Sequence, residues 1–151
     1  MSDDDFMAEA LKEAAKAAAA GEVPIGAVAV KDGVIVARAH NQVEELHSVS
    51  AHAEFMLLHQ LEKLSGDWRM SDYTFYVTKE PCPMCAGMLI NSRVKRVVFG
   101  VGDPGAGGMG GAFVLNEVPG LLWHCEVTSG VLADQSLALI RDFFRRRRSE
   151  K

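Results

Sequence analysis

Apolar residues recur every three or four positions along the first 20 residues of the chain. The repeat consists of Phe6, Met7, Ala10, Leu11, Ala14 and Ala18. This spacing predicts an amphipathic helix, and Ser2 with Asp5 matches the pattern of a capping box at its start. Because glycine is a typical helix stop, the helix is expected to end at Gly21.

Two β-type runs follow, at residues 25–30 and 34–39. The Asp-Gly pair between them favours a tight turn, so the two runs predict an antiparallel hairpin. The polar stretch 41–50 then leads into a second predicted helix over 51–64.

The middle of the chain alternates a strand at 73–78, a helix at 83–92 and a strand at 95–100. This alternation favours a right-handed crossover and a partly parallel sheet. A short strand at 125–128 and a helix over 132–148 complete the chain. We therefore expect an α/β fold, a three-layer α/β/α sandwich with a central mixed sheet of about five strands, in a single domain spanning residues 1–151.

The composition is typical of a globular protein, with 48% hydrophobic and 24% charged residues. No apolar run approaches the roughly 18 residues that would predict a membrane span. The first five residues are acidic, unlike a basic signal peptide, and three cysteines fit a reducing compartment. These features predict a cytoplasmic protein.

The net charge of -4 is unevenly distributed along the chain. Residues 1–60 carry ten acidic and four basic residues, whereas residues 61–151 carry ten and twelve. The late basic charge includes the run Arg145–Arg148, which can contact the phosphates of a polyanionic partner. The same run suits the end of a helix, where cations favour the helix dipole. The sequence leaves both interpretations open.

Two short stretches carry the candidate chemistry. His52 and Glu54 lie in the first turn of one predicted helix, and Cys82 and Cys85 lie at the start of the next. In the first turn, side chains gather around the open end of the helix, so residues two apart can address one atom. Imidazole and thiolates are typical zinc ligands. We predict a zinc site formed by His52, Cys82 and Cys85. Glu54 stays off the metal as a general acid and base.

The alternative is a structural zinc, which requires four protein ligands. The fourth could be His47, His59 or Cys125. His59 is two helical turns from His52. His47 lies in a loop and has no second ligand at a metal-binding spacing. Cys125 is expected to be a small buried apolar residue. Structural sites usually show a second close pair of ligands, and the sequence has none, so we favour a catalytic site.

These motifs resemble a known family. His-Ala-Glu at 52–54 followed by Pro-Cys-Pro-Met-Cys at 81–85 is the signature of the cytidine-deaminase-like zinc deaminases. Within them, the chain resembles the bacterial tRNA-specific adenosine deaminases over nearly its whole length. The matching segments are 21–28 (GEVPIGAV), 51–54 (AHAE), 84–87 (MCAG), 96–100 (RVVFG) with Asp103, and 142–145 (DFFR).

The resemblance implies a cytidine-deaminase-like fold, one Zn²⁺ per subunit and a homodimer. It also implies hydrolytic deamination of adenosine to inosine at the wobble position of a tRNA anticodon. A zinc-activated hydroxide would attack C6 of a flipped-out adenine, while Glu54 passes protons to N1 and to the departing ammonia.

The resemblance also implies substrate contacts. Asn41 is the expected contact to the base edge, Asp103 is expected near the ribose of the target nucleotide, and Ala53 is a further substrate-binding residue. The arginines of the run Arg145–Arg148 (Arg145, Arg146, Arg147 and Arg148) become candidate phosphate contacts. Without the resemblance, the residue types favour turn-forming roles for Asn41 and Asp103.

Residues 100–111 contain seven glycines, in a Gly-x-Gly-x-x-Gly pattern at 100–105. A dinucleotide site would need a helix there, which Pro104 and the further glycines exclude, so we expect a mobile loop beside the active site. The chain departs from the family at Gly105, where a lysine is usual, and at 121–124, where an asparagine-containing segment is usual. Trp123 in that segment would stack on a base or, as we favour, pack into the core.

Two other functions remain open at this point. One is a deaminase of a free nucleobase or nucleoside, of the guanine or cytosine type. The other is a non-catalytic RNA-binding module with a structural zinc.

Overall fold

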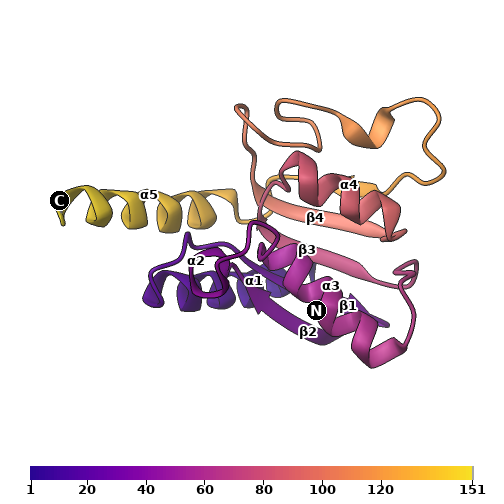
Figure 1. The fold of residues 1–151 in the computed structure, drawn as a ribbon, viewed down its shortest axis with the longest axis horizontal. Helices are drawn as coiled ribbons and strands as arrows, with labels where there is room; N and C mark the ends of the chain where they lie inside the picture. Colours follow the sequence, from indigo (N-terminus) through magenta and orange to yellow (C-terminus); the bar gives the residue numbers. More distant parts are fainter. Residues whose placement is uncertain (151) are drawn as a thin grey trace.

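A computed structural model describes residues 1–150, and its five strands form one sheet between two layers of helices (Figure 1). The helices are α1 (Asp3–Ala19), α2 (Val43–Leu46), α3 (Ala53–Ser65), α4 (Pro83–Asn91) and α5 (Ala133–Ser149), with a 3-10 helix η1 (Leu115–Glu117). The strands are β1 (Gly26–Lys31), β2 (Val34–His40), β3 (Thr74–Lys79), β4 (Arg96–Val101) and β5 (Glu126–Thr128). The predicted fold class is confirmed.

The sheet is mixed and has the order β2-β1-β3-β4-β5. β1 pairs antiparallel with β2 and β3, whereas β4 runs parallel to β3 and to β5. Asp32 and Gly33 both have positive φ, 52° and 74°, as a tight turn between β1 and β2 requires. β3 therefore joins an antiparallel half to a parallel half, and the chain leaves it directly for α4.

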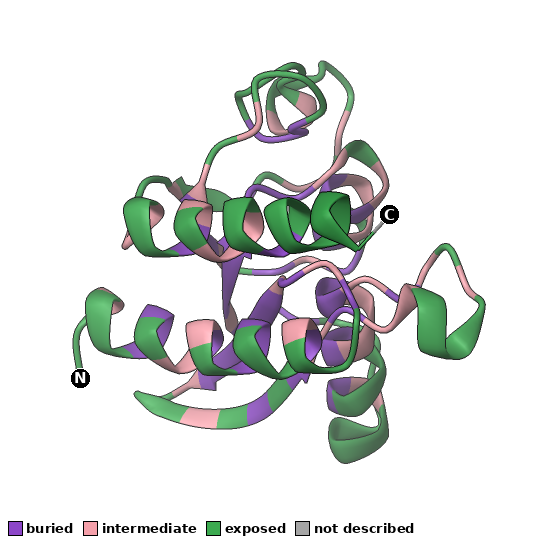
Figure 2. Ribbon diagram, turned by 90° about the vertical axis from the view of Figure 1, so that its left-hand side faces the viewer, coloured by how far each residue is buried: buried purple, intermediate pink, exposed green. Residues whose placement is uncertain are grey.

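Each face of the sheet is covered by two helices. α1 and α5 lie on one face, and in Figure 2 their outer surfaces are exposed while buried residues turn toward the sheet. α3 and α4 lie on the other face, above the larger core. That core is built from residues such as Leu57, Leu61, Phe75, Leu89 and Val97, all fully buried. The smaller core on the α1 side joins Phe6 and Met7 to Val28, Tyr76 and Val98.

The last turns of α5 extend beyond the sheet (Figure 1). Of the apolar stripe predicted for this helix, Phe143 is buried, but Phe144 is 44% exposed. The arginines that follow are all exposed. No helix among residues 1–150 combines the length and the apolar character needed to cross a membrane.

The helix α2 lies within the polar stretch 41–50, where no helix was predicted from the sequence. Its N-cap residue, Gln42, makes no side-chain capping bond. Instead, the buried carboxylate of Glu22 accepts hydrogen bonds from the backbone N–H groups of Glu44 and Glu45, at 3.0 and 2.8 Å. The capping residue therefore lies 22 positions upstream, outside any local capping pattern.

Candidate metal centre and active site

The candidate metal ligands lie at the starts of two neighbouring helices, α3 and α4. His52 is the N-cap of α3 and Cys82 is the N-cap of α4, and both have extended backbone conformations. Neither side chain caps its own helix, so both are free to point away from it. Pro83 occupies the first turn of α4, where proline is favourable. Cys85 lies one turn into the same helix.

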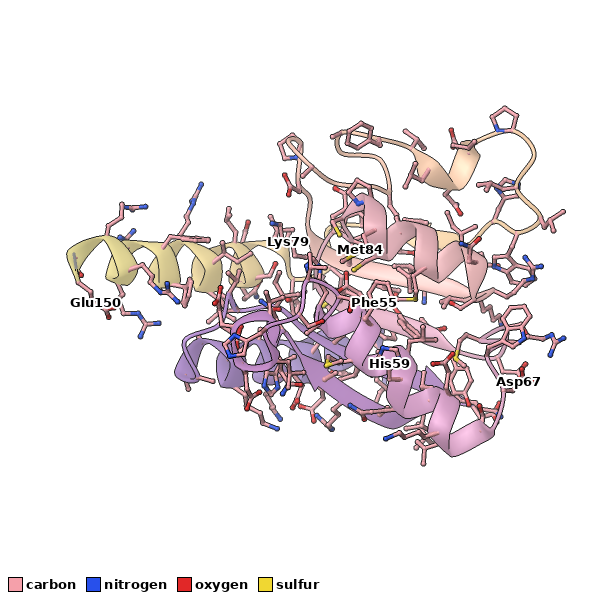
Figure 3. The ribbon with its side chains drawn as sticks, in the orientation of Figure 1. Phe55, His59, Asp67, Lys79, Met84 and Glu150 are labelled. Carbon is pink, nitrogen blue, oxygen red and sulfur yellow. The ribbon has the colours of Figure 1, made fainter. Side chains whose placement is uncertain are left out.

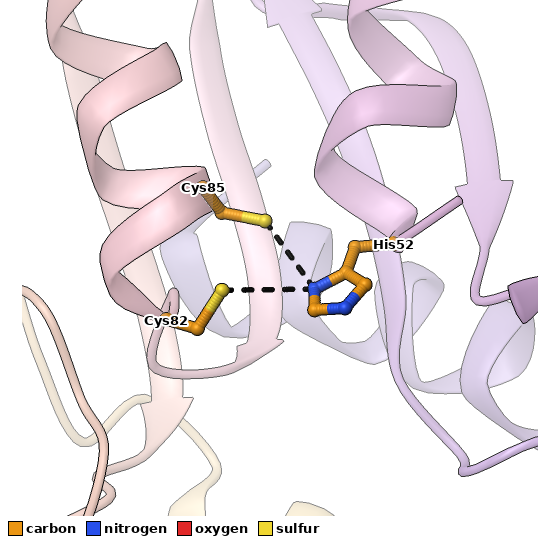
Figure 4. A group of neighbouring side chains, drawn as sticks. All are labelled: His52, Cys82 and Cys85. Carbon is orange, nitrogen blue, oxygen red and sulfur yellow. Dashed lines mark hydrogen bonds between the residues drawn. The ribbon is translucent and has the colours of Figure 1, made fainter. Parts of the chain in front are cut away.

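The three side chains converge on one point (Figure 4). The Nδ1 atom of His52 lies 3.7 Å from the Sγ of Cys82 and 3.4 Å from the Sγ of Cys85. All three ligand atoms lie within 4.8 Å of one another. A tetrahedral zinc with ordinary Zn–N and Zn–S bonds holds such atoms about 3.6 Å apart. The type and spacing of the donors therefore fit a zinc ion.

The charges of the cluster depend on one another. The largest effect on the pKa of Cys82 is the hydrogen bond from the Cys85 thiol, which lowers it. Burial raises this pKa, but the contact with His52 lowers it further, and the pKa of Cys82 falls to about 4. The same bond, together with burial, raises the pKa of Cys85. The bond to Cys82 also raises the pKa of His52. The lowered pKa of Cys82 favours its thiolate, the form that binds metals.

Glu54 lies beside the three ligands but outside their cluster. Its side chain is only 3% exposed, and burial raises the pKa of this carboxyl group. A carboxyl group with a raised pKa can both accept and donate a proton near neutral pH. Its position and environment therefore suit proton transfer.

A small cavity of about 70 Å³ opens at this cluster and is lined by Ile25, His52, Glu54, Lys79, Glu80, Cys82 and Asp103. A larger cavity of about 450 Å³ shares Ile25 and His52 with it and also contains Asn41, Phe143, Phe144 and Arg147. The structure thus places Asp103 beside the candidate ligands and Asn41 in the adjoining space. Ala53 is fully buried and lines neither cavity.

Asn41 and Asp103 both form turns and both line the site. Asn41 donates from Nδ2 to the carbonyl oxygen of Val23, and its Oδ1 accepts from the N–H of Val43, both at 3.3 Å. Asp103 Oδ1 accepts from the backbone N–H groups of Gly105 and Ala106, at 3.0 and 3.1 Å. Both side chains are therefore held in place by backbone groups while they line a cavity.

The carboxylate of Asp103 also forms an ion pair with Lys79, at 3.3 Å. Burial raises the pKa of Asp103, but the two backbone N–H groups and Lys79 outweigh it, so the pKa is lowered overall. Figure 3 shows Lys79 near the centre of the molecule, far from Asp67 at the other end of the sheet. A positive and a negative side chain thus lie together at the mouth of the small cavity.

The four arginines of the run Arg145–Arg148 differ in their surroundings. Arg147 lines the larger cavity, donates to the carbonyl oxygen of Gly21 at 2.8 Å and lies over the ring of Phe143. Arg145 instead pairs with Asp142 along α5. Only Arg147 of the four borders the space that contains His52 and Asn41.

The candidates for a fourth zinc ligand lie elsewhere. His59 is exposed further along α3 than Phe55, as Figure 3 shows, and contacts Glu62. His47 is exposed and ends α2. Cys125 is buried, and burial raises its pKa to about 11. Within residues 1–150, none of the three belongs to the cluster, so the geometry favours an open site.

Two charged residues that line the small cavity, Lys79 and Glu80, were not predicted from the sequence. Lys79 ends β3 and Glu80 follows it, and the only hint was their closeness to the cysteine motif. Trp123, by contrast, packs against the larger core and donates from Nε1 to the carbonyl oxygen of Val94 at 2.9 Å. This agrees with the favoured interpretation of Trp123 as a core residue.

Comparison with known proteins identifies the family. Residues 1–148 match the MafB19-like deaminase family. The chain is 46% identical to the tRNA-specific adenosine deaminase of Bacillus subtilis (strain 168) over 149 residues, which is 99% of this chain and 92% of the relative. The chain belongs to the tRNA-specific adenosine deaminase family. The predicted resemblance is confirmed, and the chain is a deaminase.

The fold of the chain is also similar to solved structures of deaminases. A structure from a study of tRNA:A34 deaminases has a TM-score of 0.87 and 36% identity, and the match covers 89% of this chain and 98% of the other. A guanine deaminase from Nitrosomonas europaea has a TM-score of 0.78 at 24% identity, covering 93% of this chain and 83% of the other. That lower identity shows a shared fold alone.

We predict that His52, Cys82 and Cys85 together bind one zinc ion. Cys85→Ser should lower the zinc content well below the expected ratio of about one per chain, because an oxygen replaces one of three close donors. Cys125→Ser is the matched control, since that cysteine is buried outside the cluster. Elemental analysis of both variants, with circular dichroism to check folding, measures the effect. Full zinc content in Cys85→Ser would contradict the assignment.

Proposed function

We propose that the chain is a zinc-dependent hydrolytic deaminase that converts adenosine to inosine at the wobble position of a tRNA anticodon. One observation carries the proposal: three zinc-type donors converge beside a buried carboxyl group that stays outside their cluster. Three donors leave a coordination position open, as in catalytic rather than structural zinc sites. The family relationship supports adenosine in tRNA as the substrate.

The reaction replaces the amino group at C6 of adenine by oxygen from water and releases ammonia. When bound, zinc supplies a Lewis acid that makes water nucleophilic at neutral pH. Glu54 takes one proton from the water and delivers it to N1. It then takes the second proton from the new hydroxyl group at C6 and delivers it to the leaving amino group, which departs as ammonia. Burial raises the pKa of this carboxyl group, which favours its protonated form between the two transfers.

The target base must leave its stack to reach Glu54, because the cluster lies inside a small cavity. Asn41 is proposed to contact the edge of the base from the adjoining cavity, and Asp103 to accept a hydrogen bond from the ribose. Both side chains are already fixed by backbone hydrogen bonds, so little rotational entropy is lost when they bind. Ala53, the first residue of α3, is proposed as a further substrate-binding residue.

The RNA backbone is proposed to follow the larger cavity toward α5. Arg147 borders that cavity, and Arg145, Arg146 and Arg148 are exposed on the same helix end. Basic side chains on a protruding helix suit phosphate contacts. Because tRNA is the proposed substrate, the cytoplasm is the proposed location.

A homodimer is proposed from an exposed apolar surface near α4. Phe113, Val114, Val118 and Leu122 are 41–86% exposed on the segment around η1. Beside them, Ile90, Leu115 and Leu121 line a groove of about 220 Å³ between α4 and η1. Apolar side chains gathered in this way are typical of a protein interface.

The alternative functions receive less support. The likeness to a guanine deaminase shows the fold alone and carries no argument about substrate. A non-catalytic module with a structural zinc would need a fourth protein ligand, and among residues 1–150 only three donors converge. Tests on an anticodon stem-loop and on free nucleosides separate these functions.

Glu54→Gln tests the proposed chemistry. It should retain zinc and fold but reduce deamination of an anticodon stem-loop by roughly 10²–10⁴-fold, because the amide cannot transfer protons. Inosine formation is measured on the zinc-loaded protein, with free adenosine, guanine and cytosine as competing substrates. Glu62→Gln, a change at a partly exposed position on the same helix, is the matched control.

Two outcomes would contradict this proposal. Unchanged activity in Glu54→Gln would remove the carboxyl group from the mechanism. Turnover of only the free compounds by the unmodified protein would replace tRNA by a small-molecule substrate.

Arg147→Gln tests the proposed path of the RNA. It should weaken stem-loop binding and reduce the slope of log affinity against log salt by about 1, because one phosphate contact is lost. Arg69→Gln is the control, since Arg69 pairs with Asp67 at the other end of the sheet. Equal effects of the two variants would show only a general charge effect.

A further inference from the structure

The glycine-rich loop at 102–111 folds around one buried side chain. Glu80 follows β3 directly and is 5% exposed. Its Oε1 accepts a hydrogen bond from the backbone N–H of Asp103, and its Oε2 accepts from those of Met109 and Gly111, each at 2.9 Å. One carboxylate therefore ties together both ends of a loop that has little regular structure of its own.

Two glycines let the loop approach this carboxylate. A Cβ atom added at Gly107 would lie 2.2 Å from the carboxyl carbon of Glu80. One added at Gly111 would lie 2.6 Å from Oε1 of Glu80 and 2.2 Å from the backbone oxygen of Asp103. A Cβ at Gly105 would meet nothing closer than 3.4 Å. The first two glycines are thus required by close approach, whereas Gly105 is not.

The anchored loop forms one wall of the active site. Glu80 and Asp103 line the same small cavity as His52 and Glu54. The N–H of Gly108 donates to the carbonyl oxygen of Pro81 at 2.8 Å, directly before the candidate ligand Cys82. The loop, the start of α4 and the mouth of the cavity are therefore joined through a few backbone contacts.

We propose that Glu80 is a positioning residue that fixes the 102–111 loop and so holds Asp103 at the mouth of the cavity. Lys79, the preceding residue, contacts the carboxylate of Asp103. Glu80 holds the backbone of Asp103 and Lys79 holds its side chain. The effect on catalysis rests on the proposed deaminase function, whereas the effect on the loop does not.

The arrangement of donors makes Glu80→Gln an informative change. A glutamine side chain has the same shape but only one acceptor oxygen. Turned toward Met109 and Gly111, that oxygen preserves two of the three bonds. The amide NH₂ then faces the N–H of Asp103, and two donors oppose each other. The substitution should therefore release Asp103 first, with β3 and α4 intact.

Hydrogen exchange measured by mass spectrometry tests the loop directly. In zinc-loaded Glu80→Gln, amides in 103–111 should exchange roughly tenfold faster, with β3 and α4 unchanged. Glu117→Gln, an exposed change after the loop, should match the unmodified protein. Unchanged exchange in 103–111 would overturn the proposal, whatever the activity. Loss of zinc with an unchanged loop would also overturn it, because Glu80 would then act on the metal ligands.

A pair of glycine variants provides an independent test. Gly107→Ala should accelerate exchange across 103–111, since its Cβ would displace the Glu80 carboxylate. Gly105→Ala should leave the protection of the loop in place. Equal protection in the two variants would contradict the close packing around Glu80.

A double-mutant cycle links the loop to catalysis. Glu80→Gln should lower kcat/KM on the anticodon stem-loop by about tenfold, but by less than about twofold when Asp103 is already alanine. Equal losses in both backgrounds would show that Glu80 does not act through Asp103. If the unmodified protein does not deaminate RNA, the proposed function fails, and the exchange measurements still decide the role of Glu80 in the loop.

Discussion

The site depends on two helix N-termini that meet beside the C-terminal end of the central strand β3. β3 lies between the antiparallel and the parallel halves of the sheet, and α4 starts where β3 ends. α3 packs against the same face and begins beside it. Both helices thus direct the positive ends of their dipoles, with His52 and Cys82 as N-caps, at one point. Thiolates and hydroxide, both anions, are favoured there.

The local parts of this arrangement could be predicted from the sequence. The helices α1 and α3 followed the hydrophobic period because each buries one face. The strands β1, β3 and β4 were recognised instead as short apolar runs, because they are buried on both faces of the sheet. His52, Glu54, Cys82 and Cys85 could be grouped because their spacing fits helix starts and their side chains suit zinc and proton transfer. The cluster could be predicted because its residues form two pairs that are each close in sequence, His52 with Glu54 and Cys82 with Cys85.

The parts that escaped prediction depend on partners far apart in the chain. Glu22 caps α2 from 22 residues away, Glu80 holds a loop 23–31 residues later, and Arg147 contacts Gly21 across 126 residues. No local pattern marks such a pair. The glycine count predicted a loop beside the active site, but the carboxylate that anchors it became visible only in three dimensions. Whether the loop moves during turnover stays a prediction.

For Asn41 and Asp103, the residue type favoured a turn-forming role, whereas the family resemblance favoured a substrate contact. The structure shows why both roles could be predicted. Each side chain accepts backbone hydrogen bonds as a turn residue does, and each lines a cavity next to His52. A turn that fixes a polar side chain also orients it for a ligand. The two interpretations therefore describe one arrangement, in which local backbone bonds prepare the site.

X-ray absorption spectroscopy of the zinc-loaded protein tests the central claim most directly. An open catalytic site predicts a first shell of two sulfur atoms at about 2.3 Å with one imidazole nitrogen and one non-protein oxygen at about 2.0–2.1 Å. The oxygen should be replaceable by a small ligand while the sulfur and nitrogen signals persist. A third sulfur or a second imidazole would close the tetrahedron with protein ligands and contradict the account.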